Sequence, residues 1–229
     1  MDRVQIVAYL PEYYADFIHL FRQGWWENVP RAMIQGITRK KFLAFILSAS
    51  CILATDVITF TLLVLSLILA RISCVYFCYF KYSKLHLATD LKDEELKFYT
   101  NSPNILLVAK LVETQKIIGS ISYVEMDKTT VKMSRLNVHS DFRGLKIGWK
   151  LVGELMLQAK ANGYIKMYIK TSSPNLAAQR LYTKMGFQQL DQRLCFENTI
   201  VDLCSGLYDI AYIKHLYLTT RIQQLNLVK

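Results

Sequence analysis

The longest hydrophobic stretch of the chain covers residues 42–80, and Asp56 and Arg71 are its only formally charged residues. A core helix of a soluble protein rarely stays apolar over this length, whereas one membrane span needs about 20 residues. The stretch therefore predicts a membrane segment. Its first part, residues 42–55, would rise only about 21 Å as an α-helix, which is short of a hydrocarbon core of about 30 Å.

Basic residues border the hydrophobic stretch on both sides, namely Arg39, Lys40 and Lys41 before it and Lys81 and Lys84 after it. Basic flanks favour the cytosolic side of a membrane, so both ends are expected there. This arrangement predicts a hairpin, either two crossings or a re-entrant loop, with its turn near Asp56, where a charge reaches water or head groups. The alternative is one tilted helix over residues 57–80, with Arg71 reaching towards the interface.

Hydrophobic patterns on either side of this stretch predict both strands and helices. VQIVAYL (residues 4–10) is typical of a strand, and EYYADFIHLFRQGWWENV (residues 12–29) is typical of an amphipathic helix that ends near Pro30. A short helix is expected at residues 90–101. Three apolar runs follow in close order, ILLVAKLV, KIIGSISYV and TVKMSRLNV, and the short turns between them predict an antiparallel meander.

The last part of the chain continues the mixture of patterns. IGWKLVGELMLQAKANG (residues 147–163) places apolar residues at four-residue steps and predicts a helix. YIKMYIK (residues 164–170) alternates like a half-buried strand, and PNLAAQRLYTKMG (residues 174–186) predicts a second helix. Further strands are expected near residues 193–203 and 207–218. This order of elements predicts a mixed α/β (α+β) fold.

Charge and cysteine use narrow the partners and the compartment. The chain of 229 residues carries a formal net charge of +10, which suits nucleic acid, an anionic membrane face or an anionic cofactor. The sequence has no zinc-finger spacing, aromatic RNA-binding signature or long basic run, so nucleic acid is not an expected partner. Five cysteines without a framework spacing favour reduced thiols and a polypeptide that faces the cytosol. The first residues do not read as a signal peptide.

Candidate chemistry begins at DFRGLKIGWKLV, residues 141–152, where Arg143, Lys146 and Lys150 surround two glycines at a helix start. The first N–H groups of a helix are unpaired and carry partial positive charge, and glycines let a ligand approach the backbone. This combination favours a phosphate-bearing ligand. From these residues alone, a loop followed by a surface helix with solvated lysines is an equal alternative.

Two motifs in order resemble the GNAT superfamily of N-acetyltransferases: RGLKIG at residues 143–148, and NLAAQRLYTKMGF at residues 175–187 after the next strand. The hydrophobic stretch further resembles an insertion of the camello subfamily of membrane-bound N-acetyltransferases. The resemblance implies the GNAT acyl-CoA N-acyltransferase fold with an inserted membrane hairpin at residues 41–81. The strand and helix of residues 1–40 and the catalytic core of residues 82–229 would then share one side of the bilayer, which favours a hairpin over a single span.

The resemblance also implies that the loop binds the pyrophosphate of acetyl-CoA, the co-substrate, without a metal ion. The loop residues are Arg143, Gly144, Leu145, Lys146, Ile147 and Gly148. The family pattern is Gln or Arg, two residues, Gly, one residue, then Gly or Ala, so Lys146 stands where the middle glycine is expected. We hypothesise that its ammonium group contacts a phosphate in place of the close approach that a glycine allows.

Catalytic roles follow from the same resemblance. Val138 would offer its backbone N–H to the thioester oxygen, and Tyr182 would protonate the departing CoA thiolate. Asn175 would contact the pantetheine arm, with capping of the next helix as the competing role. The strand before the loop lacks the glutamate that many family members use as a base. Glu125 and His139 are therefore the candidate bases, with a chain of water molecules as the alternative.

Together these features predict a membrane-bound N-acetyltransferase that moves the acetyl group of acetyl-CoA to a primary amine by direct attack. Members of the resembled subfamily acetylate cysteine S-conjugates, aspartate or protein lysines, so the acceptor stays open among these classes. The expected location is the endoplasmic-reticulum membrane, with the catalytic domain facing the cytosol and membrane lipid as a partner. The alternative is a membrane-anchored acyl-CoA-binding pseudoenzyme, or a scaffold whose basic surface meets anionic lipids.

Overall fold

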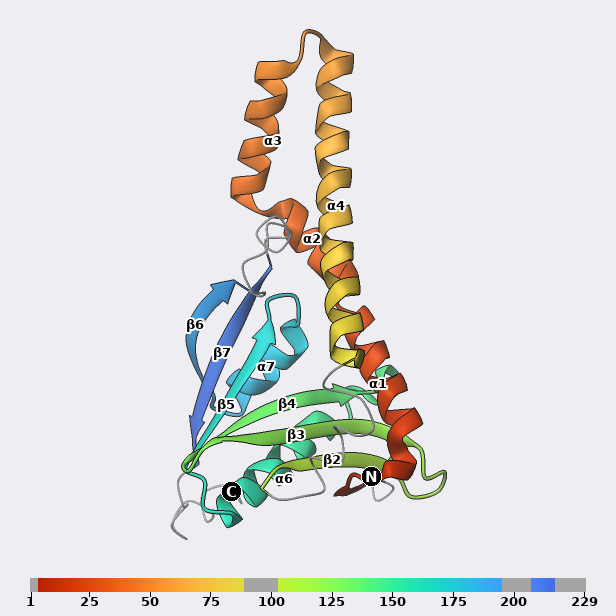
Figure 1. Ribbon diagram of the computed structural model, residues 1–229, viewed down its shortest axis with the longest axis vertical. Coiled ribbons are helices and arrows are strands. Elements are labelled where there is room, and N and C mark those ends of the chain that lie inside the picture. Colours follow the sequence, from red (N-terminus) through yellow and green to blue (C-terminus); the bar gives the residue numbers. More distant parts are fainter. Residues whose placement is uncertain (1–3, 89–102, 195–206, 217–229) are drawn as a thin grey trace.

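The computed structural model describes residues 4–88, 103–194 and 207–216 and contains a seven-stranded sheet with helices on both faces (Figure 1). The strands are β1 (Val4–Ala8), β2 (Ile105–Leu111), β3 (Ile117–Asp127), β4 (Thr130–Val138), β5 (Lys166–Ser172), β6 (Gln188–Leu194) and β7 (Tyr208–His215). The α-helices are α1 (Tyr14–Trp26), α2 (Val29–Thr38), α3 (Lys40–Leu53), α4 (Val57–Ala88), α6 (Ile147–Ala161) and α7 (Leu176–Lys184), and short 3-10 helices are η1 (Pro11–Tyr13) and η3 (Ser140–Phe142).

The strand order in the sheet is β1-β2-β3-β4-β5-β7-β6. Strands β1 to β4 form the antiparallel meander that the sequence predicts, extended by the N-terminal strand. Strands β4 and β5 are parallel, and β5, β7 and β6 are antiparallel to their neighbours. The predicted mixed α/β fold is therefore confirmed, and the parallel pair β4–β5 joins its two antiparallel halves.

Successive side chains of β2 point to opposite faces of the sheet, and both faces are buried. Leu107 and Ala109 belong to a core cluster with α6 and α7, whereas Leu106 and Val108 belong to a second cluster with α1. All four side chains are at most 3% exposed. A strand that is covered on both faces has a continuous apolar sequence, which is why ILLVAKLV lacks the polar alternation of a surface strand.

Gly24 allows helix α1 to lie directly against β4. A Cβ atom at this position would be 2.4 Å from Oδ1 of Asn137, a distance at which one of the two must shift. The Asn137 amide is itself held, because its Nδ2 donates to the backbone carbonyl of Arg135 at 3.3 Å. The missing side chain therefore brings the last turn of α1 close to the end of β4.

The region after α1 differs from the sequence prediction. The predicted helix does end before Pro30, but a second helix, α2, begins at Val29 with this proline in its first turn. Proline fits a first turn because the N–H that it lacks has no helical partner there. Pro30 is thus compatible both with the end of one helix and with the start of the next, and the sequence pattern predicted only the helix end.

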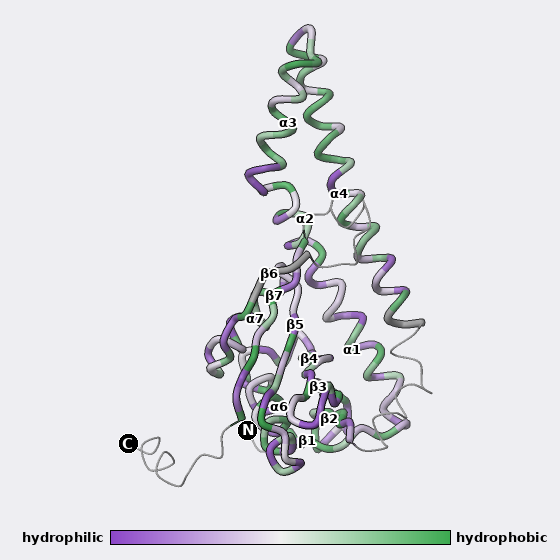
Figure 2. The backbone as a smooth tube through the Cα atoms, turned by 60° about the vertical axis from the view of Figure 1, so that its left-hand side comes forward, coloured by the Kyte–Doolittle hydropathy of each residue, from purple (hydrophilic) through white to green (hydrophobic). Residues whose placement is uncertain are grey.

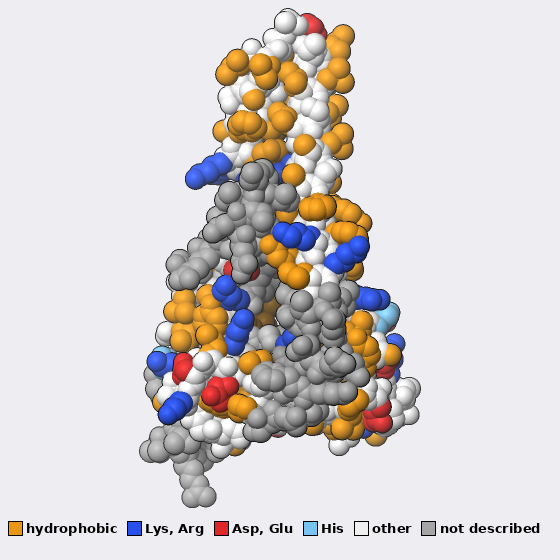
Figure 3. All heavy atoms as spheres, in the orientation of Figure 1, with side chains coloured by type: hydrophobic (Ala, Val, Ile, Leu, Met, Phe, Trp, Pro, Cys, Tyr) orange, Lys and Arg blue, Asp and Glu red, His pale blue; other side chains and the backbone are white. Residues whose placement is uncertain are grey.

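The hydrophobic stretch forms two helices, α3 and α4, that lie side by side, with the chain turning back at residues 54–56 (Figure 1); insertion of this hairpin into a membrane stays a prediction. Asp56 caps the start of α4, because its Oδ1 accepts hydrogen bonds from the N–H groups of Ile58 and Thr59 at 2.8 and 3.0 Å. The tube of the hairpin is coloured mostly as hydrophobic in Figure 2, and the space-filling view shows Lys and Arg side chains near its base (Figure 3).

Helix α4 is long because it serves both the hairpin and the domain. Its second half packs on α1 and α2, where Val75 and Tyr79 form a buried cluster with Val29 and Ala32. Near the middle of α4, Arg71 donates from Nε to the carbonyl of Gly36 at 3.3 Å, and its guanidinium lies over the ring of Phe42. Arg71 thereby joins α2, α3 and α4 at one point.

Two sequence predictions fall on residues that the structure does not describe. The helix expected at residues 90–101 lies entirely outside the described residues. The strand expected at residues 193–203 overlaps the end of β6, and its remainder also lies outside the described residues. The strand expected at residues 207–218 is present as β7 within that range.

A matched pair of glycine substitutions tests the contact between α1 and β4. Gly153 lies in α6 with no atom within 4 Å of a built Cβ, so Gly153→Ala is expected to raise the free energy of unfolding by about 0.5–1 kcal/mol through helix propensity. Gly24→Ala gains the same propensity but meets Asn137, which costs about 1–3 kcal/mol. Urea unfolding in detergent, followed by circular dichroism, should therefore rank Gly24→Ala below Gly153→Ala. Equal stabilisation by the two changes would contradict the close approach.

Candidate active site

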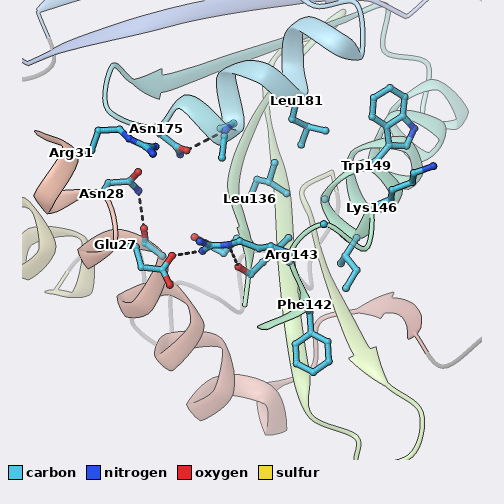
Figure 4. Close-up of a pocket in the computed structure, with 18 of the residues that line it drawn as sticks. Glu27, Asn28, Arg31, Leu136, Phe142, Arg143, Lys146, Trp149, Asn175 and Leu181 are labelled. Carbon is cyan, nitrogen blue, oxygen red and sulfur yellow. Dashed lines mark hydrogen bonds and ion pairs between the residues drawn. The ribbon is translucent and has the colours of Figure 1, made fainter. Parts of the chain in front are cut away.

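A cavity of about 720 Å³ lies between the α1–α2 segment, the end of β4 and the start of α7 (Figure 4). Its lining combines charged, amide and apolar side chains with backbone. The lining residues are Gly24, Glu27, Asn28, Pro30, Arg31, Ile34, Leu136, Asn137, Val138, Phe142, Arg143, Gly144, Lys146, Ile147, Gly148, Trp149, Asn175, Ala177, Ala178 and Leu181. Most of the loop predicted to bind phosphate lines this cavity. Residues of the α1–α2 segment, which precedes the hairpin in the sequence, line it as well.

The cavity exists because β4 and β5 separate. Their parallel pairing begins at Thr130 and ends at Met133, which lies opposite Ile169. Beyond this pair β4 continues to Val138 along a different course from β5, so that part of its edge is not paired with β5 (Figure 1). A strand edge with unpaired backbone groups is ready to bond an extended ligand.

A bulge redirects the unpaired end of β4. The strand has one more residue than β3 between Ser134 and Asn137, and Arg135 takes a φ of 56° there. The N–H of His139 donates to a carbonyl of β3 at 2.9 Å. Because backbone groups alternate in direction along a strand, the N–H and C=O of Val138 point away from β3 and towards the cavity that this residue lines.

The loop before α6 presents backbone N–H groups to the cavity. Gly144 and Lys146 both have a positive φ, of 79° and 59°, and α6 begins directly afterwards. The first N–H groups of this helix have no helical acceptor, which makes the site suitable for an anion. A Cβ at Gly148 would lie 3.4 Å from a methyl group of Leu181, so the second glycine keeps this part of the cavity open.

Lys146 stands where the family pattern has a glycine, and its backbone adopts the left-handed conformation that glycine favours. For a residue with a Cβ this conformation costs about 1–2 kcal/mol. The side chain extends beside Trp149, on the opposite side of the loop from Arg143 (Figure 4). Lys146 therefore keeps the backbone turn of the loop and adds a cation at the cavity rim, while Leu145 is exposed and does not line the cavity.

Arg143 ties the loop to β4 and to α1. Its Nε donates to the carbonyl of Val138 at 3.1 Å, and its terminal nitrogen forms an ion pair with Glu27 (Figure 4). The guanidinium therefore lies across the cavity floor, between the free strand edge and the end of α1. This contact between residues 116 positions apart in sequence is not visible in any local motif.

Asn175 lines the cavity and also caps α7, because its Oδ1 accepts from the N–H of Ala178 at 3.2 Å. The capping role weighed against ligand contact is thus present, and it still leaves the side-chain nitrogen available. Gln179 adds a second tie between α7 and β5 by donating to the carbonyls of Ser172 and Ser173. These bonds fix the wall of the cavity that faces α2.

Tyr182 lies one residue beyond Leu181 on α7 but inside the core. It is 3% exposed and packs against Phe187 and Tyr212. Burial, with a smaller contribution from Tyr212, raises the pKa of the Tyr182 phenol above its ordinary value. The phenol is therefore protonated at neutral pH, as a proton donor must be, although the residue is not part of the cavity lining.

The two bases suggested by the sequence do not line the cavity. Glu125 accepts a hydrogen bond from the hydroxyl of Tyr164 at 2.5 Å, and burial followed by this carboxylate raises the pKa of Tyr164 to about 12. Glu125 pairs with Val131, seven residues and about 23 Å along β4 from Val138. His139 directs its Nδ1 to the N–H of Asp141 and caps η3.

Six lining residues from the α1–α2 segment were not among the sequence candidates, and they are Gly24, Glu27, Asn28, Pro30, Arg31 and Ile34. They carry no motif, and their importance depends on how α1 docks on β4 and on a helix that the sequence did not predict. Within the described residues no group of three or more His, Cys, Asp or Glu side chains could hold a metal ion.

Comparison with known proteins supports the same fold and family. The sequence model of the Acetyltransferase (GNAT) family matches residues 71–187. The chain is 25% identical over 178 residues to N-acetylaspartate synthetase of Danio rerio, covering 76% of this chain and 62% of that protein. It is 25% identical over 197 residues to the probable N-acetyltransferase camello of Xenopus tropicalis, covering 82% and 88%. The chain thus spans less than two thirds of the synthetase and most of the camello protein.

Solved structures agree in fold. A GNAT-family acetyltransferase of Staphylococcus aureus Mu50 superposes with a TM-score of 0.54 at 18% identity, covering 93% of this chain and 99% of that one. An N-acetyltransferase of the same strain superposes with a TM-score of 0.57 at 14% identity, covering 94% and 100%. Since the family match covers just over half of the chain, the protein belongs to the GNAT family of acetyltransferases, and its matches to camello and to N-acetylaspartate synthetase are consistent with the camello-like subfamily.

Proposed function

We propose that this chain is an N-acetyltransferase that transfers the acetyl group of acetyl-CoA to the primary amine of an acceptor. One observation carries the proposal: the unpaired edge of β4 and the N–H groups at the start of α6 open into the same cavity. An extended arm that ends in a pyrophosphate matches this pair of features, because strand edges bond extended chains and helix starts bind phosphate.

In the proposed complex the loop of residues 143–148 holds the pyrophosphate, and Lys146 adds charge at the rim. The pantetheine arm lies along β4 beside Asn175, and the N–H of Val138 receives the thioester oxygen. A hydrogen bond placed where negative charge develops lowers the barrier to attack on the carbonyl carbon. The Arg143 side chain, which uses the Val138 carbonyl, leaves the N–H of that residue free for this role.

Tyr182 is the proposed proton donor. When the amine attacks, a C–N bond forms and the C–S bond breaks, so a thiolate leaves that is stabilised by taking a proton. The Tyr182 phenol is protonated at neutral pH, because burial raises its pKa, so it has the proton that the thiolate takes. The acceptor classes implied by the resemblance to the camello subfamily are a cysteine S-conjugate, a free amino acid and a protein lysine.

The α3–α4 hairpin is the proposed membrane anchor. By length and composition, residues Val57–Leu85 of α4 are apolar enough to cross a membrane, and their most apolar 18-residue window has a mean hydropathy of 2.2. The 14 residues of α3, however, rise only about 21 Å, less than a hydrocarbon core of about 30 Å. The hairpin therefore suits entry and exit on one face, and its basic flanks favour the cytosolic face of the endoplasmic reticulum.

The first prediction concerns the donor. Tyr182→Phe should lower turnover by about 100-fold or more, because general acid catalysis contributes about 10² to 10⁴. Acetyl-CoA affinity should change little. The measurement is CoA release from acetyl-CoA by the detergent-solubilised chain, with S-benzylcysteine, aspartate and a lysine peptide as acceptors. Tyr164→Phe is the control that should keep its activity, because Tyr164 lies between α6 and β5, beside the start of β4 and outside the cavity lining. Acetyl-CoA binding without turnover of any amine would instead favour a pseudoenzyme.

The second prediction separates the two properties of Lys146. Lys146→Gly removes the charge and the backbone strain, whereas Lys146→Ala removes the charge and keeps a Cβ in the left-handed conformation. Both variants should bind acetyl-CoA about 3- to 10-fold more weakly, and Lys146→Gly should be the more stable by about 1 kcal/mol. Calorimetric titration and thermal unfolding provide the two readouts. Unchanged affinity in both variants would show that the ammonium group makes no phosphate contact.

The third prediction concerns topology. In sealed microsomes, tags at the N-terminus and the C-terminus should both be digested by added protease, because the hairpin returns to the cytosolic face. Digestion of only one tag would support a single span. Protection of both tags would place the catalytic domain in the lumen.

A further inference from the structure

Glu27 is the single carboxylate among the described residues that line the cavity, where the other charged side chains are Arg31, Arg143 and Lys146. An amine that attacks a thioester becomes strongly acidic as the C–N bond forms, so it needs a group to take its proton. Building on the proposed function, we propose that Glu27 is this group: it binds the acceptor's amine and accepts the proton during transfer.

The position of Glu27 follows from the docking of α1. Gly24 brings the last turn of the helix against β4, and Asn28 donates from Nδ2 to the carbonyl of Gly24 at 2.9 Å. Glu27 follows directly after α1 and is therefore fixed beside the end of the strand. Its side chain points towards Arg143 and the cavity, from the side opposite α7 (Figure 4).

Arg143 sets the distance between Glu27 and the reacting carbonyl. The guanidinium bonds both the Glu27 carboxylate and the carbonyl of Val138, the residue whose N–H receives the thioester oxygen in the proposed complex. One guanidinium therefore separates the carboxylate from the reacting centre. An amine that approaches the carbonyl from the α1 side meets Glu27 first, while Tyr182 lies on the α7 side with the leaving thiolate.

Only one oxygen of the carboxylate is engaged. Arg143 contacts Oε2, and among the described residues no hydrogen bond reaches Oε1. The side chain is 31% exposed, so Oε1 can meet a ligand and later exchange a proton with water. Arg31, on α2, also lines this part of the cavity.

The transfer step balances with these groups. The nitrogen lone pair attacks the carbonyl carbon, and the C–N bond forms while the N–H proton passes to Oε1 of Glu27. The C–S bond breaks, and the thiolate takes the proton of Tyr182. Glu27 then loses its proton to solvent and Tyr182 regains one, so no oxidant, reductant or further reactant is needed.

A purely structural role for Glu27 is the competing explanation, because the residue also anchors Arg143. The two roles differ in what small changes do. A tether can be kept by any acceptor of the Arg143 hydrogen bond, whereas a base must be able to take a proton. Glutamine keeps the first property and loses the second, which makes Glu27→Gln the informative variant.

The experiment uses the full chain in detergent with acetyl-CoA and whichever amine of the panel the wild type acetylates. Glu27→Gln should lower kcat by about 100-fold or more, while acetyl-CoA affinity changes less than about 3-fold. Glu27→Asp should recover part of the rate. Glu154→Gln is the matched control, a carboxylate on α6 outside the cavity lining whose loss should leave turnover unchanged.

Chemical rescue distinguishes a base from a residue that only anchors Arg143. Formate or acetate added to Glu27→Ala should restore turnover in proportion to its concentration, because a small carboxylate can occupy the vacated space and take the proton. Glu27→Gln, whose side chain fills that space, should not respond. Full kcat in Glu27→Gln, or absence of rescue in a folded Glu27→Ala that binds acetyl-CoA, overturns the proposal and leaves the transferase function intact. Absence of turnover in the wild type overturns the function and this proposal together.

Discussion

The structure depends on a short pairing between two parallel strands. Strands β4 and β5 are registered only from Thr130 to Met133 and then separate, which leaves the end of β4 with backbone groups that no strand satisfies. Unpaired strand edges are costly unless something covers them. Here Arg143 covers the carbonyl of Val138, and the cavity leaves room for an extended ligand beside it. The bulge at Arg135 and the positive φ angles of the loop all serve this opening.

The same opening is coupled to the hydrophobic hairpin. Helix α2 contributes Arg31 and Ile34 to the cavity and passes directly into α3, and Arg71 of α4 bonds the last turn of α2. The second half of α4 is packed against α1, the helix that carries Glu27 to the cavity. The two helices that complete the site are therefore held by the element that we propose to enter the membrane, so the proposed lipid and acceptor contacts would lie on one continuous part of the chain.

Much of the fold could be predicted because its signals are local. Alternation along the strands, the caps and glycines of α6 and α7, and a charge at Asp56 inside an apolar run each act within a few residues. The loop before α6 was located for the same reason, and its binding of phosphate stays a prediction. Glu27 could not be found this way, because its proposed role depends on the close approach at Gly24 and on a partner far away in sequence. The antiparallel register of β3 and β4, by contrast, could have placed Glu125 far from Val138, since the end of one strand lies beside the start of the next.

The central claim is that an acyl-CoA arm binds along the free edge of β4 and ends at the loop before α6. Hydrogen–deuterium exchange of the full chain in detergent, with and without acetyl-CoA, tests it most directly. The account predicts slower exchange across residues 134–148, where the N–H groups of Leu136, Val138 and the loop acquire partners. Slower exchange confined to other segments, with residues 134–148 unchanged, would contradict it.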